Sequence, residues 1–327
     1  MLTRRTLLPA ALALPLALPL ALPLARPTQA AGDFRAFVAG VYAEASAAGI
    51  RRDVLDAAFA GVTPNQKVID RDRKQAEFTM TWARYRALVI SDKRIASGRA
   101  AAAQYRPLIG QVEARYKVAA SVIMGIWGLE SSFGVDTGTY NVIESLATLA
   151  WEGRRARFFR AELMAALKIL NNGDITPARM TGSYAGAMGQ PQFMPTSYVR
   201  LAVDFDGDGK RDIWDSKADV LGSIANYLAV SGWRAGESWG QPVAVPPGFA
   251  ASGRDVKRPL ADWARQGVTP AAGRWAASGD TPAAVLAPDG PGTETFMVFN
   301  NFTAIRRYNP SDFYAIAVGL IGDWVMS

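Results

Sequence analysis

The segment Ser121-Val-Ile-Met-Gly-Ile-Trp-Gly-Leu-Glu-Ser-Ser-Phe-Gly134 places a single carboxylic acid on the apolar face of a predicted helix. Glu130 follows Trp127 by three residues and Ile126 by four, so the three side chains share one helix face. Burial among apolar groups disfavours the carboxylate and raises the pKa of the acid. A glutamic acid that keeps its proton near neutral pH can protonate the leaving oxygen of a glycosidic bond. The structural alternative is a core helix whose Glu130 merely reaches water, because acids are rarely buried without a partner.

The composition excludes several kinds of catalytic chemistry. The chain has 327 residues, half of them apolar, which suffices for two or three units with a substantial core. It contains no Cys and no His. Disulfides, thiolate nucleophiles, His ligands to metals and Ser-His-Asp catalysis are therefore excluded. Acid–base chemistry is left mainly to carboxylates, Lys and Tyr, and we expect no organic cofactor.

The charge balance is moderately positive. The formal net charge is +7, and the first 30 residues contribute Arg4, Arg5 and Arg26 with no acid, so a chain without them keeps +4. This balance suits an anionic polymer or surface. No basic run with interleaved aromatic residues is present, so we predict no nucleic-acid partner.

Residues 1–31 have the features of a cleavable secretory signal. Arg4-Arg5 precede a long region of Ala, Leu and Pro, and Thr28-Gln29-Ala30 offers small residues at a cleavage point. Three prolines in the apolar region disfavour a membrane-spanning helix. Thr3–Leu8 is also compatible with the twin-arginine route. We expect a soluble periplasmic protein without a membrane span, exported by a signal peptide through either route.

Residues 32–103 are predicted to form an N-terminal helical domain, because apolar residues recur there at helical spacing on both sides of a break at Gly61–Pro64. Within it, Tyr85 is interpreted from the pattern alone as a core residue. A further amphipathic helix is predicted over 151–171, with its arginines in solvent.

The C-terminal third changes character. Pro, Gly and short apolar runs predict a small β-containing module over 236–300, with strands near 241–248 and 293–299. Residues 301–327 are predicted to contain a loop over 306–310 and a closing helix over 313–325.

The segment Gly182-Ser-Tyr-Ala-Gly-Ala-Met-Gly-Gln-Pro-Gln-Phe-Met-Pro195 lies between predicted helices. Its three glycines, two glutamines and two prolines suit a loop whose backbone approaches a ligand closely. A tight connection between helices is the alternative.

The segment Asp204-Phe-Asp-Gly-Asp-Gly-Lys-Arg-Asp-Ile-Trp-Asp215 has the spacing of an EF-hand calcium loop with Gly209 at position 6. Position 12 is Asp where Glu is usual, and Arg211 replaces the apolar residue that pairs with a second hand. We therefore predict a lone structural calcium site, against the alternative of an acidic turn without metal. The predicted oxygen ligands are Asp204, Asp206, Asp208, the Lys210 carbonyl, Asp212 and Asp215.

Together these motifs resemble the membrane-bound lytic murein transglycosylase B family in a soluble form. They occur in the order of the family between about residues 34 and 326. The segments that carry the resemblance are Trp127–Gly134, Gly182–Gln190, Gln192–Pro195, the Asp204–Asp215 loop followed by Trp233, and Tyr308–Tyr314.

The resemblance implies an α+β, mainly α fold, with a lysozyme-like core over 104–235 that carries the calcium loop, flanked by the helical domain and the β-module. It implies cleavage of the N-acetylmuramic acid–N-acetylglucosamine β-1,4 bond of peptidoglycan without water, leaving a 1,6-anhydromuramic end. Glycan strands are the expected partner, and cell-wall synthesis proteins are candidates. The chain departs from the family at Pro191 and Thr196 and lacks the lipid-anchor Cys. Motif matching places the catalytic acid on Glu130 and substrate contacts on Tyr85, Ser183, Gln192, Asn309 and Tyr314.

One carboxylate can suffice for this reaction. Glycosidases that use water need two, and the sequence leaves Glu144 and Asp136 open as a second. A muramic substrate brings its own nucleophiles, since its acetamido oxygen and C6 hydroxyl can attack the anomeric carbon intramolecularly. A hydrolytic muramidase on the same fold and a non-catalytic, calcium-stabilised glycan-binding protein remain the alternatives.

Overall fold

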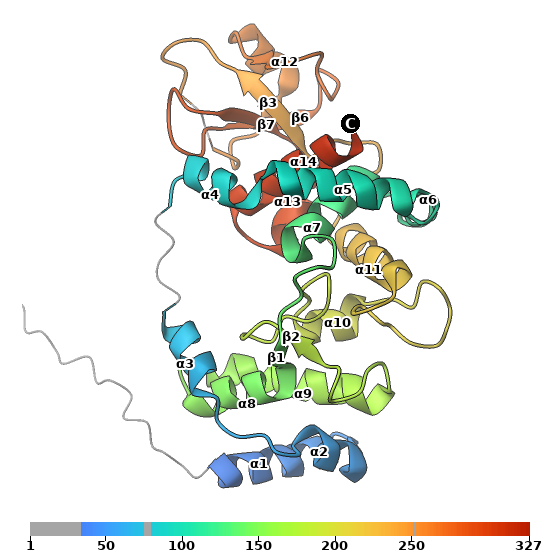
Figure 1. Ribbon diagram of the computed structural model, residues 1–327. Coiled ribbons are helices and arrows are strands. Elements are labelled where there is room, and N and C mark those ends of the chain that lie inside the picture. The colour runs from blue at the N-terminus through green and yellow to red at the C-terminus, as the bar shows by residue number, and fades with distance from the viewer. Residues whose placement is uncertain (1–33, 75–79, 251–252) are drawn as a thin grey trace, which may run out of the picture. The chain divides into compact units, whose positions relative to one another are not determined.

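The computed structural model describes residues 34–74, 80–250 and 253–327, and most of their regular structure is helical (Figure 1). The predicted signal peptide lies outside the described residues. Among those described, no helix has both the length and the apolar character that crossing a membrane requires. The prediction of a mainly α fold with small sheets is confirmed.

Helices α7 (Ala120–Ser131) and α14 (Asp312–Met326) pack along each other at the centre of the first hydrophobic core. Glycines permit the close approach of their backbones. A Cβ atom on Gly125 would lie 2.1 Å from the carbonyl oxygen of Val318, and one on Gly322 would lie 2.1 Å from that of Ser121. This contact fixes the helix that carries Glu130 against the last helix of the chain.

Helix α7 ends at Ser131. Ser132, Phe133 and Gly134 then adopt left-handed backbone conformations, with φ of 49°, 62° and 89°. The Ser131 hydroxyl accepts a hydrogen bond from the Gly134 amide at 3.1 Å. This turn leaves Glu130 in the last turn of the helix, where its side chain can leave the core.

Further helices surround this pair. Helices α4, α5 and α13 contact α14, and α5, α6 and α11 contact α7. Their bounds are α4 Trp82–Val89, α5 Asp92–Gln104, α6 Arg106–Tyr116, α11 Lys217–Val230 and α13 Asn300–Tyr308.

A second core forms around α8 and α9, against which α1, α2, α3 and α10 pack. The helices of residues 32–103 thus contribute to two cores, with α1–α3 in the second and α4–α5 in the first. The bounds are α1 Phe34–Ala47, α2 Arg52–Ala58, α3 Gln66–Arg73, α8 Val142–Glu152, α9 Ala156–Asn172 and α10 Pro195–Leu201.

The helix predicted over 151–171 is two helices in the structure. Gly153, with φ of 100°, ends α8, and α9 begins at Ala156. The prediction that its arginines are merely solvated is wrong for Arg154 and Arg155. Arg154 and Arg155 form ion pairs with the buried Asp72 of α3, so they attach that helix to the second core.

The β-module contains an antiparallel five-stranded sheet in the order β4-β6-β7-β3-β5. The two predicted strands appear as β3 and β7, while β6 was missed. The predicted loop over 306–310 is wrong in its first half, because α13 continues to Tyr308. The module also contains helix α12 (Leu260–Arg265). Outside the module, β1 (Tyr140–Asn141) pairs with β2 (Thr181–Gly182). The strands of the module are β3 Gly240–Ala244, β4 Arg258–Pro259, β5 Thr269–Pro270, β6 Pro282–Leu286 and β7 Thr295–Val298.

Candidate active site

Among the described residues, Tyr314 is the hydrogen-bond donor at the carboxyl group of Glu130. The Tyr314 hydroxyl donates to Glu130 Oε1 over 2.6 Å. Burial raises the pKa of Glu130 to about 7, and the hydrogen bond from Tyr314 acts in the opposite direction. The acid is therefore present in both protonation states near neutral pH.

Two tyrosines stand beside this acid. Tyr314 lies in the first turn of α14, and the Tyr308 ring stacks on it with centroids 6.4 Å apart and planes inclined by 13°. Burial, and then the charge of Glu130, raise the pKa of both tyrosines well above the usual range. Both hydroxyls therefore stay protonated and act as donors. Sequence reasoning quoted Tyr308 in a motif but assigned it no role.

A pocket of about 550 Å³ is lined by Tyr314 and its neighbours. It brings together three of the predicted substrate contacts, Tyr85, Asn309 and Tyr314. Tyr85, interpreted from the pattern alone as a core residue, is half-buried. Burial is the larger cause, and the charge of Glu130 the smaller one, that together raise the pKa of Tyr85 to about 12. The remaining lining residues are Met80, Ser311, Asp312 and Phe313.

The other two predicted contacts, Ser183 and Gln192, lie on the loop between β2 and α10. The Ser183 hydroxyl accepts from the Ala187 amide at 3.0 Å. Gln192 has a left-handed backbone with φ of 51°. Its side-chain Nε2 donates to the Thr137 carbonyl at 3.0 Å. This loop is tied to the tyrosines at Pro191, whose carbonyl accepts from the Tyr308 hydroxyl at 2.6 Å.

Gln190 attaches this loop to α7. Its Oε1 accepts from Trp127 Nε1 at 2.9 Å, and its Nε2 donates to the Trp214 carbonyl at 2.6 Å. Gly134 allows the close fit, because a Cβ there would lie 2.4 Å from Gln190 Oε1. One buried side chain thus connects α7, the β2–α10 loop and the acidic loop that follows α10.

The two carboxylates left open by the sequence lie in different settings. Glu144 Oε2 accepts from Asn65 Nδ2 at 2.8 Å, which joins α8 to the residue that caps α3. Asp136 is exposed, in the turn after α7.

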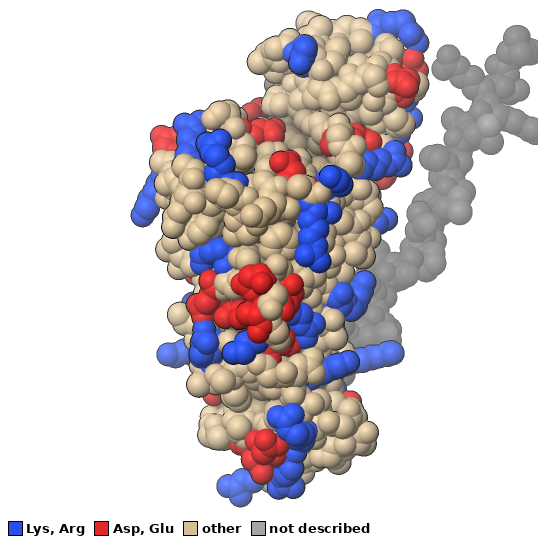
Figure 2. Space-filling model, turned by 90° about the vertical axis from the view of Figure 1, so that its right-hand side faces the viewer, with Lys and Arg blue, Asp and Glu red and all other residues tan. Residues whose placement is uncertain are grey.

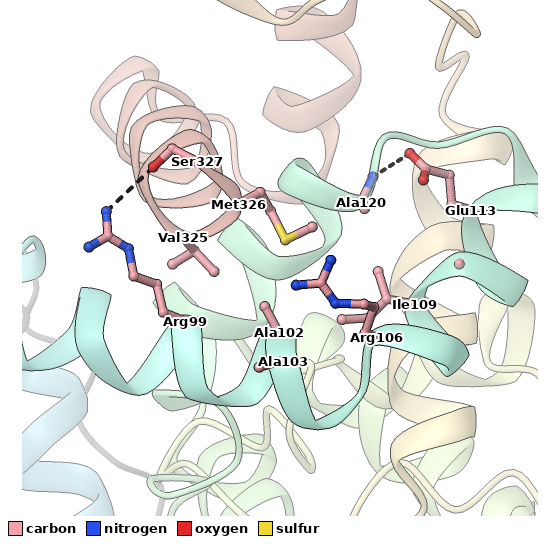
Figure 3. A pocket seen from close by; sticks show the side chains of 11 residues that line it. Arg99, Ala102, Ala103, Arg106, Ile109, Glu113, Ala120, Val325, Met326 and Ser327 are labelled. Carbon is pink, nitrogen blue, oxygen red and sulfur yellow. Dashed lines mark hydrogen bonds between the residues drawn. The ribbon is translucent and has the colours of Figure 1, made fainter.

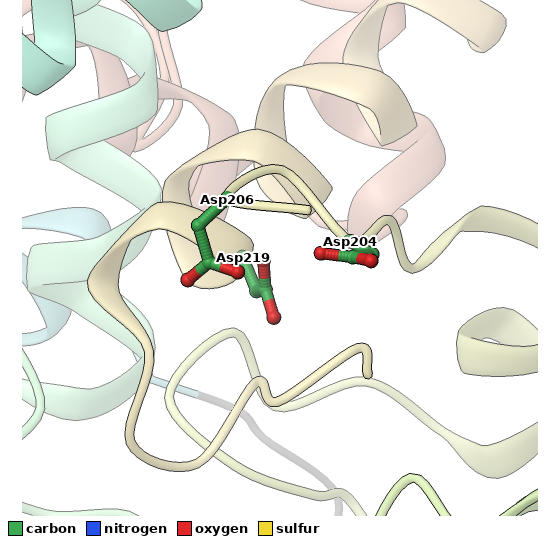
Figure 4. A group of neighbouring side chains, drawn as sticks. All are labelled: Asp204, Asp206 and Asp219. Carbon is green, nitrogen blue, oxygen red and sulfur yellow. The ribbon is translucent and has the colours of Figure 1, made fainter. Parts of the chain in front are cut away.

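The acidic loop brings carboxylates together, although in a different set from the one predicted. Ligand oxygens of Asp204, Asp206 and Asp219 lie within 4.8 Å of one another (Figure 4). Figure 2 shows acidic side chains gathered on the face that carries this loop. Asp219 lies in the first turn of α11, beyond the 12-residue pattern, and was missed. Burial raises the pKa of Asp219 to about 6.

The other predicted side-chain ligands bond within the protein, as Asp204, Asp206 and Asp219 also do. Asp215 forms an ion pair with Arg179, and Asp208 Oδ1 accepts from the Lys210 amide at 2.8 Å. Asp212 Oδ1 accepts from the amides of Trp214 and Asp215, each at 2.9 Å. Two carboxylates of this loop and one of α11 converge, and such a set fits a hard cation such as calcium, which prefers oxygen ligands.

A second pocket, of about 360 Å³, lies between α5, α6 and the end of α14 (Figure 3). Two of its charged side chains have structural partners. Glu113 Oε1 accepts from the Ala120 amide at 2.9 Å and so caps α7. Arg99 donates to the Trp324 carbonyl at 3.0 Å and holds the end of α14.

Comparison with known proteins identifies the family of the chain. The family model described as "Transglycosylase SLT domain" matches residues 33–323. The chain is 35% identical over 251 residues to membrane-bound lytic murein transglycosylase B of Escherichia coli (strain K12), which covers 75% of this chain and 67% of that protein.

Solved structures match as well. SltB3 from Pseudomonas aeruginosa, in complex with NAG-anhNAM-pentapeptide, has a TM-score of 0.86 and 45% identity over 90% of this chain and 80% of that one. The Escherichia coli lytic transglycosylase Slt35, in complex with calcium, has a TM-score of 0.74 and 30% identity over 90% of this chain and 92% of that one. The resemblance expected from the motifs is confirmed, and the chain belongs to the Transglycosylase SLT domain family of lytic transglycosylases.

Proposed function

We propose that this protein is a lytic transglycosylase that cleaves the N-acetylmuramic acid–N-acetylglucosamine bond of peptidoglycan, with Glu130 as acid and then base. The observation that carries the proposal is a carboxyl group of pKa about 7, held at 2.6 Å by Tyr314 beside a pocket lined by Tyr85 and Asn309. The muropeptide bound to SltB3 supports a ligand of the same class here.

In the first step, protonated Glu130 gives its proton to the bridging oxygen while the bond from that oxygen to the muramic anomeric carbon breaks. The muramic acetamido oxygen attacks this carbon and takes up the developing positive charge. Glu130 is left as a carboxylate, which the Tyr314 hydroxyl stabilises.

In the second step, the muramic C6 hydroxyl attacks the same carbon and displaces the acetamido oxygen. The Glu130 carboxylate accepts the hydroxyl proton, which restores the acid and leaves a 1,6-anhydro end. No water is consumed, so a second catalytic carboxylate is not required. The attack is intramolecular and gains the large effective concentration of such reactions.

The remaining site residues position sugars. Ser183 orients the acetamido group, and Tyr85, Gln192, Asn309 and Tyr314 hold the rings on either side of the bond. The substrate lies in the periplasm, the compartment for which the N-terminal segment predicts export.

We also propose that Asp204, Asp206 and Asp219 hold a calcium ion. The calcium in the Slt35 structure and the convergence of these carboxylates within 4.8 Å support this site. The ion would neutralise the carboxylates and join α10 to α11, so its role is stability.

The test is digestion of purified sacculi by the parent and by Glu130→Gln, with mass spectrometry of the released muropeptides. The parent should release anhydro ends, which lack one water. In Glu130→Gln the rate of muropeptide release should fall about 10²–10⁴-fold. Asp136→Asn, a matched acid in the next turn, should keep its rate.

Digestion by Glu130→Gln at the parent rate would refute the assignment. Hydrated reducing ends, together with loss of activity in Asp136→Asn, would instead identify a hydrolytic muramidase with two carboxylates.

A further inference from the structure

Helix α4, which carries Tyr85, is held at its first turn by the β-module. Asp289, in the connection between β6 and β7, accepts from the Trp82 amide at 2.5 Å and from the Ala83 amide at 2.9 Å. Glu294, from the same connection, accepts from Trp82 Nε1 at 2.6 Å and from Arg86 Nη1 at 3.0 Å. Each carboxylate uses both of its oxygens, and the partners are more than two hundred residues apart.

These contacts suit the beginning of a helix. The first amides of a helix have no acceptor within it, and negative charge is favourable there. Asp289 satisfies two of these amides, and the Thr81 hydroxyl accepts a third, from Arg84 at 3.3 Å. A helix of eight residues is marginal alone, so the placement of α4 depends on such tertiary contacts.

Aromatic packing continues the connection into the pocket. The buried Trp82 ring packs edge-on against Phe296 of β7 and against Phe313 of α14, with centroids 5.8 Å apart in both pairs. Tyr85 packs on the same Phe313 at 5.8 Å and lies 6.2 Å from Trp82. A continuous set of contacts therefore links the β6–β7 connection to a side chain that lines the pocket.

We infer that Asp289 and Glu294 are positioning residues, through which the β-module sets the orientation of α4 and presents Tyr85 to the glycan. The inference rests on the proposed function, since it assigns the β-module a part in binding the same substrate. It makes the β-module a determinant of affinity for the glycan, acting through α4.

The test compares Asp289→Ala, Asp289→Asn and Glu294→Gln with the parent, as full-length processed proteins acting on a soluble glycan fragment of defined length. Loss of the hydrogen bonds from Asp289 or Glu294 to α4 should raise KM by roughly five- to tenfold. The value of kcat should stay within about twofold, because Glu130 and Tyr314 are untouched. Asp289→Asn keeps one acceptor and should recover part of the loss. Asp280→Asn is the matched control, since this exposed acid of the same module bonds to Ser278.

A double-mutant cycle with Tyr85→Ala separates positioning from general stabilisation. If Asp289 acts through Tyr85, the KM of the double variant should not exceed that of Tyr85→Ala alone. Effects that multiply, or an unchanged KM in both Asp289→Ala and Glu294→Gln, would overturn the inference while the proposed function stands. A parent that releases no anhydro ends would overturn the proposed function, and this inference with it. Thermal midpoints identify any variant that fails to fold, and Glu294→Gln, which keeps the size of the side chain, is the variant least exposed to that failure.

Discussion

Glu130 is subject to two opposing influences. Burial at the end of α7 favours the protonated acid, and the hydrogen bond from Tyr314 favours the carboxylate. With the pKa near 7, neither form is strongly preferred at neutral pH. The same group can therefore give a proton in the first step and accept one in the second.

This balance predicts the pH dependence of activity. We expect kcat/KM to fall as pH rises through about 7, because ionisation of Glu130 in the free enzyme removes the acid. Tyr314→Phe removes the bond that stabilises the carboxylate, so the pKa of Glu130 should rise and the alkaline limb should move to higher pH, with a lower maximal rate. Tyr42→Phe, on α1, is the control. pH–rate profiles on soluble glycan fragments test this, and a limb that stays in place in Tyr314→Phe would contradict it.

Single residues were predictable where a local pattern reports their role. Glu130 stood out as an acid on an apolar helix face, and motif matching named Tyr85, Asn309 and Tyr314, which line one pocket. Their contact with substrate stays a prediction. Tyr308 was not assigned, because its importance comes from the Pro191 carbonyl, over a hundred residues earlier in the chain.

Among the elements, the contact of α7 with α14 sets the site, because it brings Glu130 and Tyr314 together. Gly125 is essential to that contact, since a Cβ atom there would lie 2.1 Å from the Val318 carbonyl oxygen, which leaves no room for a methyl group. We expect Gly125→Ala to lower the free energy of unfolding by about 3 kcal/mol, at the upper end for overpacking, since backbone cannot yield as a side chain does.

Gly110→Ala on α6 is the matched control. A Cβ there meets no atom within 4 Å, so alanine should be neutral or should stabilise by up to about 1 kcal/mol. Urea unfolding of both variants measures the difference. Equal stabilities would show that the two helices can separate without cost.

Element boundaries were less predictable than element types. The 151–171 segment reads as one amphipathic helix, yet Gly153 breaks it, and Arg154 and Arg155 turn to a buried Asp72 on a distant helix. Strand β6 was missed because its pairing with β7 is a tertiary property that no local alternation reveals.

Across the whole described chain, two hydrophobic cores meet at the acidic loop. Helix α10 and the buried Ile213 and Trp214 belong to the second core, and α11 belongs to the first. The EF-hand spacing predicted ligands within one loop. The geometry instead adds Asp219 of α11, so an ion here would connect the two cores.

Calcium should therefore stabilise the entire fold. At a free concentration one hundred times Kd, the gain in the free energy of unfolding is about 2.7 kcal/mol, and a chelator should remove it. Asp219→Asn should lose most of this increment, whereas Asp215→Asn should keep it, because Asp215 is paired with Arg179. Thermal unfolding of each variant with calcium and with chelator measures the increments. If Asp215→Asn loses the increment and Asp219→Asn keeps it, the ion is bound by the 12-residue EF-hand pattern and not by the set that includes Asp219 of α11. If the parent shows no increment, the loop holds its shape through its own backbone hydrogen bonds.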